Sequence, residues 1–116
     1  MKLKIDRNLI YKLLKQVPRG KVTSYKALAT AAGNPKASRA VGMFMKTNPY
    51  APHVPCHRVV YNDGRLGGFS GKTRIDDKIK MLESEGVFVK DGRIVDFKKH
   101  YFENFSIEKA KKDVLS

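Results

Sequence analysis

Cysteine is almost absent from this sequence, and no long apolar run occurs in it. A single cysteine, Cys56, stands among 116 residues, so the chain holds no internal disulfide. An unpaired thiol fits a reducing compartment. No apolar run approaches the roughly 20 residues that a membrane span needs, and the N-terminal residues lack the apolar core of a signal peptide. These absences predict a cytoplasmic protein with no membrane partner.

Acidic side chains are scarce as well. Asp and Glu number 11 against 24 Lys and Arg, which leaves a formal net charge of +13. Such an excess is more than solubility requires and indicates a surface that binds a polyanion. A generally solvated lysine face is the alternative, and charge alone does not separate DNA from RNA or from acidic lipid headgroups.

Metal-binding and phosphate-binding motifs are missing. One cysteine and the scattered His53, His57 and His100 supply no credible set of four zinc ligands. The Gly67-Gly68-Phe69-Ser70-Gly71 segment lacks the Gly-Lys-Ser/Thr spacing of a P-loop. We therefore expect no metal and no cofactor.

Two helix patterns occupy the first third of the chain. Asp6 caps the first, whose apolar residues recur at helical spacing until Pro18 and Gly20 end it. Ser24 caps the second, which runs over residues 25–32. Both patterns predict amphipathic helices that bury one face.

A further helix follows at once and completes a helix-turn-helix pattern. Asn34 and Pro35 supply its cap and first residue, and it ends near Lys46. Lys36 and Arg39 are the only long side chains near its start, on an outer face of small residues. Those small residues are Ala37, Ser38 and Gly42. A smooth face with one arginine suits close approach to a DNA groove better than reading of base edges; an ordinary core helix is the alternative.

The second half of the chain alternates short strands and helices. A strand is expected over residues 57–60, and a helix from Thr73 to near Gly86. The core-facing residues of that helix are expected to be Ile75, Ile79 and Leu82. A hairpin with a type I′ turn follows over residues 87–96, and a tail helix over 106–115. The fold class predicted is mostly α with short β-hairpins.

The central segment, Val-Pro-Cys-His-Arg-Val-Val over residues 54–60, carries the candidate chemistry. A thiol reacts as the thiolate, which a neighbouring base or positive charge favours. Adjacent residues on a strand point to opposite faces, so Cys56 and His57 would need a bridging water or a bend at Pro55 to act together. The alternative is that Cys56 is a small buried apolar residue.

Pro-Cys-His-Arg-Val resembles the active-site signature of the O6-alkylguanine-DNA alkyltransferases. The resemblance runs from about Val17 to Gly86, with several motifs in the family's order. These motifs cover residues 20–25, 33–42, 48–49 and 67–71. The resemblance implies a winged helix-turn-helix-like alkyltransferase domain without the family's usual N-terminal domain. We therefore expect a single domain over residues 1–116, with its core in 6–97.

The resemblance also implies direct reversal of DNA damage. An alkyl group, such as methyl, would move from the O6 atom of a flipped guanine in double-stranded DNA to Cys56, once per molecule. His57 matches the base that takes the thiol proton through a water. Glu85 matches the glutamate that orients the histidine, with Glu83 as the weaker candidate because the segment carries about two extra residues.

Further roles follow from the same resemblance. Asn48 would brace the turn before the active-site loop, and Tyr25 would donate a proton to the leaving guanine. Arg39 would fill the place of the flipped base, and neighbouring residues would pack into the minor groove. Those neighbours are Lys36, Ala37, Ser38 and Gly42; the pocket wall would be Met43, Val59, Phe69, Ser70 and Gly71. Phe69 replaces a tyrosine common in the family, which leaves substrate preference open.

Two other functions compete with this one. Alkyltransferase-like lesion sensors have a similar domain and flag damage without transfer, but their signature cysteine is replaced, whereas Cys56 is retained here. A plain winged-helix transcription factor would bind DNA by sequence and be indifferent to Cys56. The resemblance favours a monomeric transferase that works on DNA, in the nucleus if the source is eukaryotic.

Overall fold

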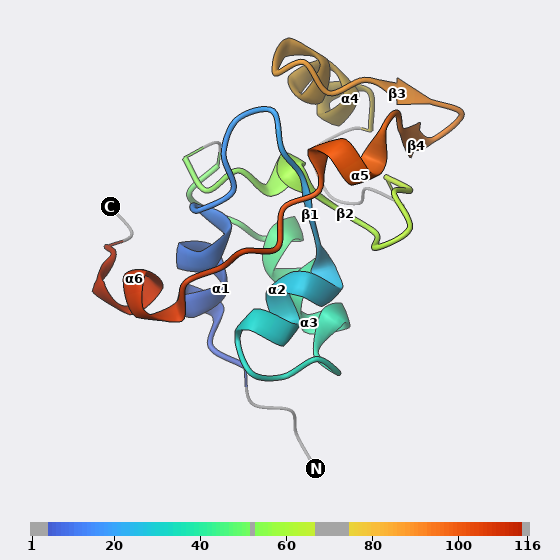
Figure 1. The fold of residues 1–116 in the computed structure, drawn as a ribbon. Helices are drawn as coiled ribbons and strands as arrows, with labels where there is room; N and C mark the ends of the chain where they lie inside the picture. Colours follow the sequence, from blue (N-terminus) through green and yellow to red (C-terminus); the bar gives the residue numbers. More distant parts are fainter. Residues whose placement is uncertain (1–4, 52, 67–74, 115–116) are drawn as a thin grey trace.

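The computed structural model describes residues 5–51, 53–66 and 75–114, and this part of the chain is mostly helical, as predicted (Figure 1). Helices α1 (Arg7–Leu14), α2 (Tyr25–Ala31) and α3 (Ser38–Lys46) pack against one another in one half of the molecule. Helix α4 (Ile75–Ser84) lies in the other half (Figure 1). Within the described residues, no helix is both long and apolar enough to span a bilayer.

Helix α1 forms where its cap and apolar spacing predict it. The carboxylate of Asp6 accepts hydrogen bonds from the backbone N–H groups of Asn8 (2.9 Å) and Leu9 (3.2 Å), which satisfies two free donors of the first turn. Its buried face is Ile10, Tyr11, Leu13 and Leu14. The Tyr11 hydroxyl donates to the backbone carbonyl of Phe44 at 2.8 Å and so ties α1 to α3.

The helix-turn-helix differs from the prediction at one helix start. Ser24 caps α2 as expected, its Oγ accepting from the Ala27 N–H at 3.0 Å. Helix α3 begins at Ser38 rather than at Pro35, because residues 34–37 form a turn closed by the Ala37 N–H on the Asn34 carbonyl at 3.0 Å. Its end at Lys46 is as predicted.

A parallel strand pair connects the two halves of the molecule. Strand β1 (Thr23–Ser24) pairs with β2 (Val59–Val60), with Thr23 opposite Val59. The predicted strand over 57–60 is wrong in its first half, since Cys56–Arg58 forms a short 3₁₀ helix, η1. This pairing joins segments 36 residues apart, a distance over which sequence patterns carry no register.

The hairpin is the one antiparallel pair among the described strands and is shorter than predicted. Strand β3 (Val89–Lys90) pairs with β4 (Arg93–Ile94). Asp91 and Gly92 have φ of 51° and 76°, the left-handed values that both central residues of a type I′ turn require.

The C-terminal segment returns from the hairpin to α1. It contains α5 (Phe97–His100), which the sequence did not predict, and α6 (Ile107–Lys112), which is shorter than the predicted tail helix. The Gln16 side-chain amide donates to the Ser106 carbonyl and accepts from the Ser106 N–H, both at 2.8 Å. Helix α6 therefore packs on α1, far from the hairpin (Figure 1).

Candidate active site

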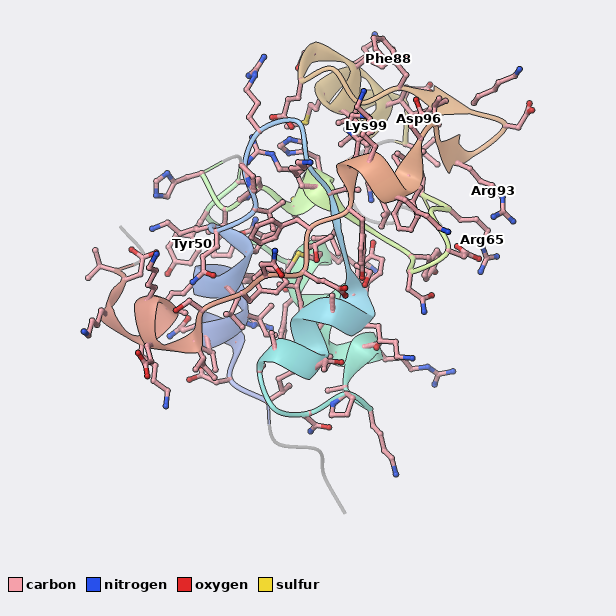
Figure 2. The ribbon with its side chains drawn as sticks, viewed as in Figure 1. Tyr50, Arg65, Phe88, Arg93, Asp96 and Lys99 are labelled. Carbon is pink, nitrogen blue, oxygen red and sulfur yellow. The ribbon has the colours of Figure 1, made fainter. Side chains whose placement is uncertain are left out.

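The loop before Cys56 is held by one asparagine side chain. The amide of Asn48 donates to the Val54 carbonyl at 2.8 Å, and its oxygen accepts from the Tyr50 N–H at 2.9 Å. The Tyr50 ring (Figure 2) packs on Tyr11 with ring centroids 5.8 Å apart. Cys56 then begins η1, half-buried, its N–H bonded to the Val54 carbonyl at 2.9 Å. Asn48 thus lies where the resemblance expects a brace.

Glu85 binds two side chains of η1 at once. Its carboxylate lies 3.1 Å from His57 Nε2, and it accepts from Arg58 Nε at 2.9 Å and Nη2 at 2.6 Å. Arg58 also donates to the Val17 carbonyl at 2.9 Å. The other candidate, Glu83, is exposed on α4 and makes none of these contacts. The geometry therefore favours Glu85 over Glu83 as the partner of the histidine.

Burial and hydrogen bonding together set the protonation of this pair. Burial lowers the pKa of His57, although the hydrogen bond and charge of Glu85 oppose that shift. Burial alone would raise the pKa of Glu85, but hydrogen bonds from Arg58 and His57 outweigh it and hold the pKa below its usual value. A neutral imidazole beside an ionised carboxylate carries its proton on Nε2.

The other ring nitrogen is then a base. His57 Nδ1 is buried, and no atom of the described residues hydrogen-bonds to it. A neutral imidazole with Nε2–H committed to a carboxylate has its lone pair on Nδ1, which can accept a proton. Because Cys56 and His57 share a 3₁₀ turn, the expected placement on opposite faces of a strand is wrong.

Lys78 is a buried charge that the sequence did not single out. It lies on α4 with 0% of its surface exposed, and its Nζ donates to the Val59 carbonyl at 2.6 Å. Burial lowers the pKa of Lys78 to about 8, while the nearby Cys56 sulfur opposes that shift. Leu82 is buried as predicted, but Ile75 is 41% exposed. The one signal for Lys78 was its position four residues before Leu82, on the same helix face.

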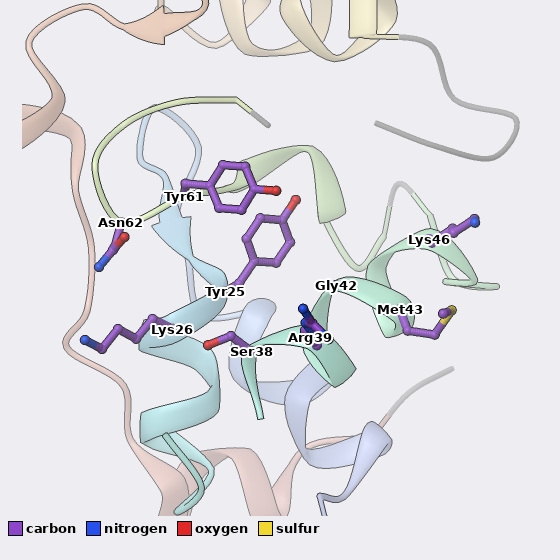
Figure 3. Close-up of a pocket in the computed structure, with 9 residues that line it drawn as sticks. All are labelled: Tyr25, Lys26, Ser38, Arg39, Gly42, Met43, Lys46, Tyr61 and Asn62. Carbon is purple, nitrogen blue, oxygen red and sulfur yellow. The ribbon is translucent and has the colours of Figure 1, made fainter. Parts of the chain in front are cut away.

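A pocket of about 470 Å³ opens on the helix-turn-helix (Figure 3), and Cys56 is not among the residues that line it. It is lined by Tyr25, Lys26, Ser38, Arg39, Gly42, Met43, Lys46, Tyr61 and Asn62. Five of the predicted DNA-facing or pocket residues are therefore brought together here. Lys26, Lys46, Tyr61 and Asn62 also line the pocket and were not predicted from the sequence. Tyr61 reaches it through its ring contact with Tyr25, which joins segments 36 residues apart.

Other predicted residues lie elsewhere. Ala37 is 1% exposed, so its methyl group belongs to the core and not to the outer face of α3. Val59 is fully buried in the same core and is not among the residues that line the pocket. Lys36 is exposed just before α3, outside the pocket. The predicted pocket residues Phe69, Ser70 and Gly71, and the predicted cap Thr73, fall outside the described residues.

Tyr25 links the pocket to the cysteine. Its ring contacts that of Tyr61, with centroids 5.5 Å apart and planes tilted by 57° (Figure 3). Burial raises the pKa of Tyr25 to about 12, with smaller contributions from Tyr61 and from the nearby Cys56. The hydroxyl therefore keeps its proton at neutral pH and serves as a hydrogen-bond donor. Across the described residues, no cluster of three or more His, Cys, Asp or Glu side chains could hold a metal.

Two curated proteins illustrate what this chain resembles in sequence. A bifunctional methyltransferase/endonuclease of Picrophilus torridus is 44% identical over 96 residues, which is 83% of this chain and 31% of the relative. The human methylated-DNA--protein-cysteine methyltransferase is 54% identical over 80 residues, 69% of this chain and 38% of the relative. The chain thus spans about a third of the length of these curated relatives.

Solved structures share the fold. The crystal structure of S. pombe Atl1 in complex with damaged DNA containing O6-carboxymethylguanine matches with a TM-score of 0.75 and 26% identity, covering 86% of this chain and 98% of Atl1. Mycobacterium tuberculosis OGT in complex with DNA matches with a TM-score of 0.65 and 38% identity, covering 73% and 51%. The family described as 6-O-methylguanine DNA methyltransferase, DNA binding domain, matches residues 7–87. The chain belongs to this methyltransferase family.

Proposed function

We propose that this protein repairs DNA by moving an alkyl group from the O6 atom of guanine to the sulfur of Cys56. The observation that carries the proposal is the Glu85–His57 pair next to Cys56 in the chain. The pocket, which Tyr25 helps to line, supports it. The names of the relatives support the same chemistry, since the human relative is a methylated-DNA--protein-cysteine methyltransferase.

The protein's own groups account for each proton in this reaction. His57 Nδ1 takes the thiol proton through a bridging water, and Glu85 stabilises the imidazolium that results. The thiolate attacks the alkyl carbon, a C–S bond forms, and the bond from that carbon to O6 breaks with its electron pair left on guanine. Tyr25 donates a proton to the departing guanine, and the proton held by His57 restores the tyrosine.

The product determines the stoichiometry. Alkylated Cys56 is a thioether, which has no easy route to hydrolysis, so each molecule reacts once. The reaction needs no cofactor, because thiol and alkylguanine together contain every atom of the products.

The pocket accounts for access to the base. A stacked guanine hides its O6 substituent, so the nucleotide has to leave the duplex at a cost of a few kcal/mol. Arg39, exposed on α3 at the pocket rim, takes the vacated place in the stack. The partner is double-stranded DNA that carries O6-alkylguanine, bound by a monomer in the cytoplasm or, in a eukaryote, the nucleus.

A single-turnover assay tests the proposal. After incubation with a duplex containing O6-methylguanine, intact-mass measurement should show one added methyl group, and peptide mapping should place it on Cys56. Cys56→Ala should bind the same duplex with unchanged affinity and gain no mass. An unmodified Cys56 in wild-type protein that is fully bound to DNA would rule the transfer out.

A lesion sensor is the second candidate. This chain covers 98% of the Atl1 chain that was crystallised with damaged DNA. A sensor would bind the O6-methylguanine duplex more tightly than its undamaged counterpart and leave the methyl group in place. The mass assay therefore separates the two functions.

A further inference from the structure

The wall of the pocket continues, through Tyr61, onto a surface that carries two arginines. The Arg65 guanidinium lies over the Tyr61 ring, 5.2 Å from its centroid, while Tyr25 contacts the same ring from the pocket. Tyr61 is 40% exposed. A chain of contacts through Tyr25, Tyr61 and Arg65 therefore runs from the pocket to the surface of the molecule.

Arg93 is held next to Arg65. An antiparallel bridge joins Arg65 to Arg93, and the Leu66 N–H donates to the Gly92 carbonyl at 3.0 Å, so the 61–66 turn is fastened to the hairpin. Figure 2 shows both arginine side chains pointing outward side by side. Like charges directly opposite on neighbouring strands repel each other, so this pair requires a counter-charge.

Within the part of the chain that the structure describes, side chains supply only part of that counter-charge. The Asp63 carboxylate accepts from Arg65 Nε at 2.7 Å, whereas Arg93 Nη1 reaches only the Asp63 backbone carbonyl, at 3.3 Å. The hydrogen bond from the Arg65 backbone N–H, together with its side chain and the charge of Arg93, lowers the pKa of Asp63 and keeps it ionised. One carboxylate thus faces two guanidinium groups, and the Arg65 side chain is still 57% exposed.

We propose that Arg65 and Arg93 form a second DNA contact, which binds backbone phosphates of the strand next to the flipped nucleotide. Guanidinium groups bind phosphate oxygens with two N–H donors at once, and a phosphate would complete the charge balance that Asp63 begins. The ligand is duplex DNA because the pair adjoins the base pocket through Tyr61. The inference rests on the proposed function for the identity of this ligand, and it extends the DNA-binding surface from α3 to β4.

The salt dependence of DNA binding tests this site. Each phosphate contact contributes about 0.9 to the slope of log affinity against log salt concentration. On an undamaged duplex, where no transfer occurs, R65Q/R93Q should reduce that slope by about 2. The control K111Q/K112Q removes the same charge from α6, on the opposite side of the molecule from β4 (Figure 1), and should keep the wild-type slope.

The outcomes are distinguishable. If R65Q/R93Q and the control have equal slopes, the two arginines do not bind phosphate and the inference is overturned. If R65Q/R93Q does not fold, Asp63→Asn decides instead: freeing Arg65 should tighten binding severalfold, and unchanged or weaker binding overturns the inference. Methyl transfer by the wild type is measured separately, so an unmodified Cys56 contradicts the proposed function without affecting the comparison of slopes.

Discussion

At the scale of single residues, the Glu85 carboxylate has two partners. It neutralises the charge of Arg58 and it orients the imidazole of His57. The Glu85 side chain is 7% exposed and the Arg58 side chain is 16% exposed. Removal of one partner from a buried ion pair leaves the other charge uncompensated, which costs far more than loss of a surface pair. Stability and the proposed alkyl transfer therefore depend on the same carboxylate.

Glu85→Gln is expected to lose both properties. The free energy of unfolding should fall by about 3 kcal/mol, since the Arg58 charge stays buried without its carboxylate. Methyl transfer should slow by roughly a hundredfold because the tautomer of His57 is no longer set. Chemical denaturation and single-turnover transfer measure the two effects. The matched control is Glu83→Gln, an exposed change expected to stay within about 0.5 kcal/mol; equal losses in both variants would contradict the assignment.

Lys78 gives stability a distinctive dependence on pH. Its pKa falls from 10.5 to about 8 on folding, so between these values the unfolded chain binds more protons than the folded chain. The free energy of unfolding should therefore gain up to about 1.4 kcal/mol per pH unit in this window. Lys78→Met should lack this gain, whereas Lys80→Met, exposed on the same helix, should keep it. Denaturation curves at several pH values compare them; parallel profiles for wild type and Lys78→Met would refute the prediction.

At the scale of elements, local signals and tertiary contacts have separate effects on helix boundaries. Asp6 and Ser24 cap α1 and α2 where their sequence contexts predict it, since a cap bonds to N–H groups only two or three residues away. The start of α3 has no side-chain cap, and the turn over residues 34–37 precedes it instead. Burial of Ala37 in the core, a tertiary effect, accompanies the later start at Ser38.

The cap of α2 lies directly before Tyr25, the proposed proton donor. Ser24 Oγ bonds both the Ala27 N–H and, at 2.8 Å, the Tyr101 hydroxyl, and Tyr25 is the first residue of the helix. Ser24→Ala should lower the free energy of unfolding by about 1–2 kcal/mol and slow methyl transfer through a less fixed Tyr25. Ser84→Ala is the control, because its exposed hydroxyl bonds only the Met81 carbonyl of its own helix. Thermal melts and transfer rates provide the test, and equal behaviour of the two variants would count against it.

At the scale of the whole molecule, the C-terminal segment joins the hairpin to α1. It pairs beside β1 through a parallel bridge from Val22 to Tyr101, and it ends in an ion pair between Lys15 and Asp113 at 3.0 Å. Between these points Gln16 holds the Ser106 backbone by two hydrogen bonds. Contacts of this kind join residues about 80 to 100 positions apart, and none of the residues that they join lines the pocket.

Gln16→Ala is expected to weaken this attachment. Loss of two hydrogen bonds should reduce the free energy of unfolding by about 2 kcal/mol, while the methyl-transfer rate of folded protein stays unchanged because α6 lies far from the pocket (Figure 1). Asn8→Ala, an exposed change on the same helix, is the control. Denaturation and single-turnover transfer on both proteins check this, and a slower transfer in Gln16→Ala alone would show that the attachment reaches the site.

Much of the fold and the order of the site motifs followed from sequence alone. The caps of α1 and α2 and the Asp91-Gly92 turn act within a few residues, so their outcome can be predicted from the local sequence. The mostly helical class was predicted for the same reason. Cys56 and His57 were identified as a pair because they are adjacent, although their shared 3₁₀ turn replaced the expected strand.

Tertiary structure decided what depends on distant contacts. The choice of Glu85 over Glu83, the burial of Lys78 and the place of Tyr61 beside Tyr25 each join segments separated by 19 to 36 residues. No local pattern carries such information, because burial and charge pairing depend on which surfaces meet after the chain has folded. The sequence by itself therefore determined which chemical groups are available, and the packing of α4 and the 61–66 turn determined which of them act together.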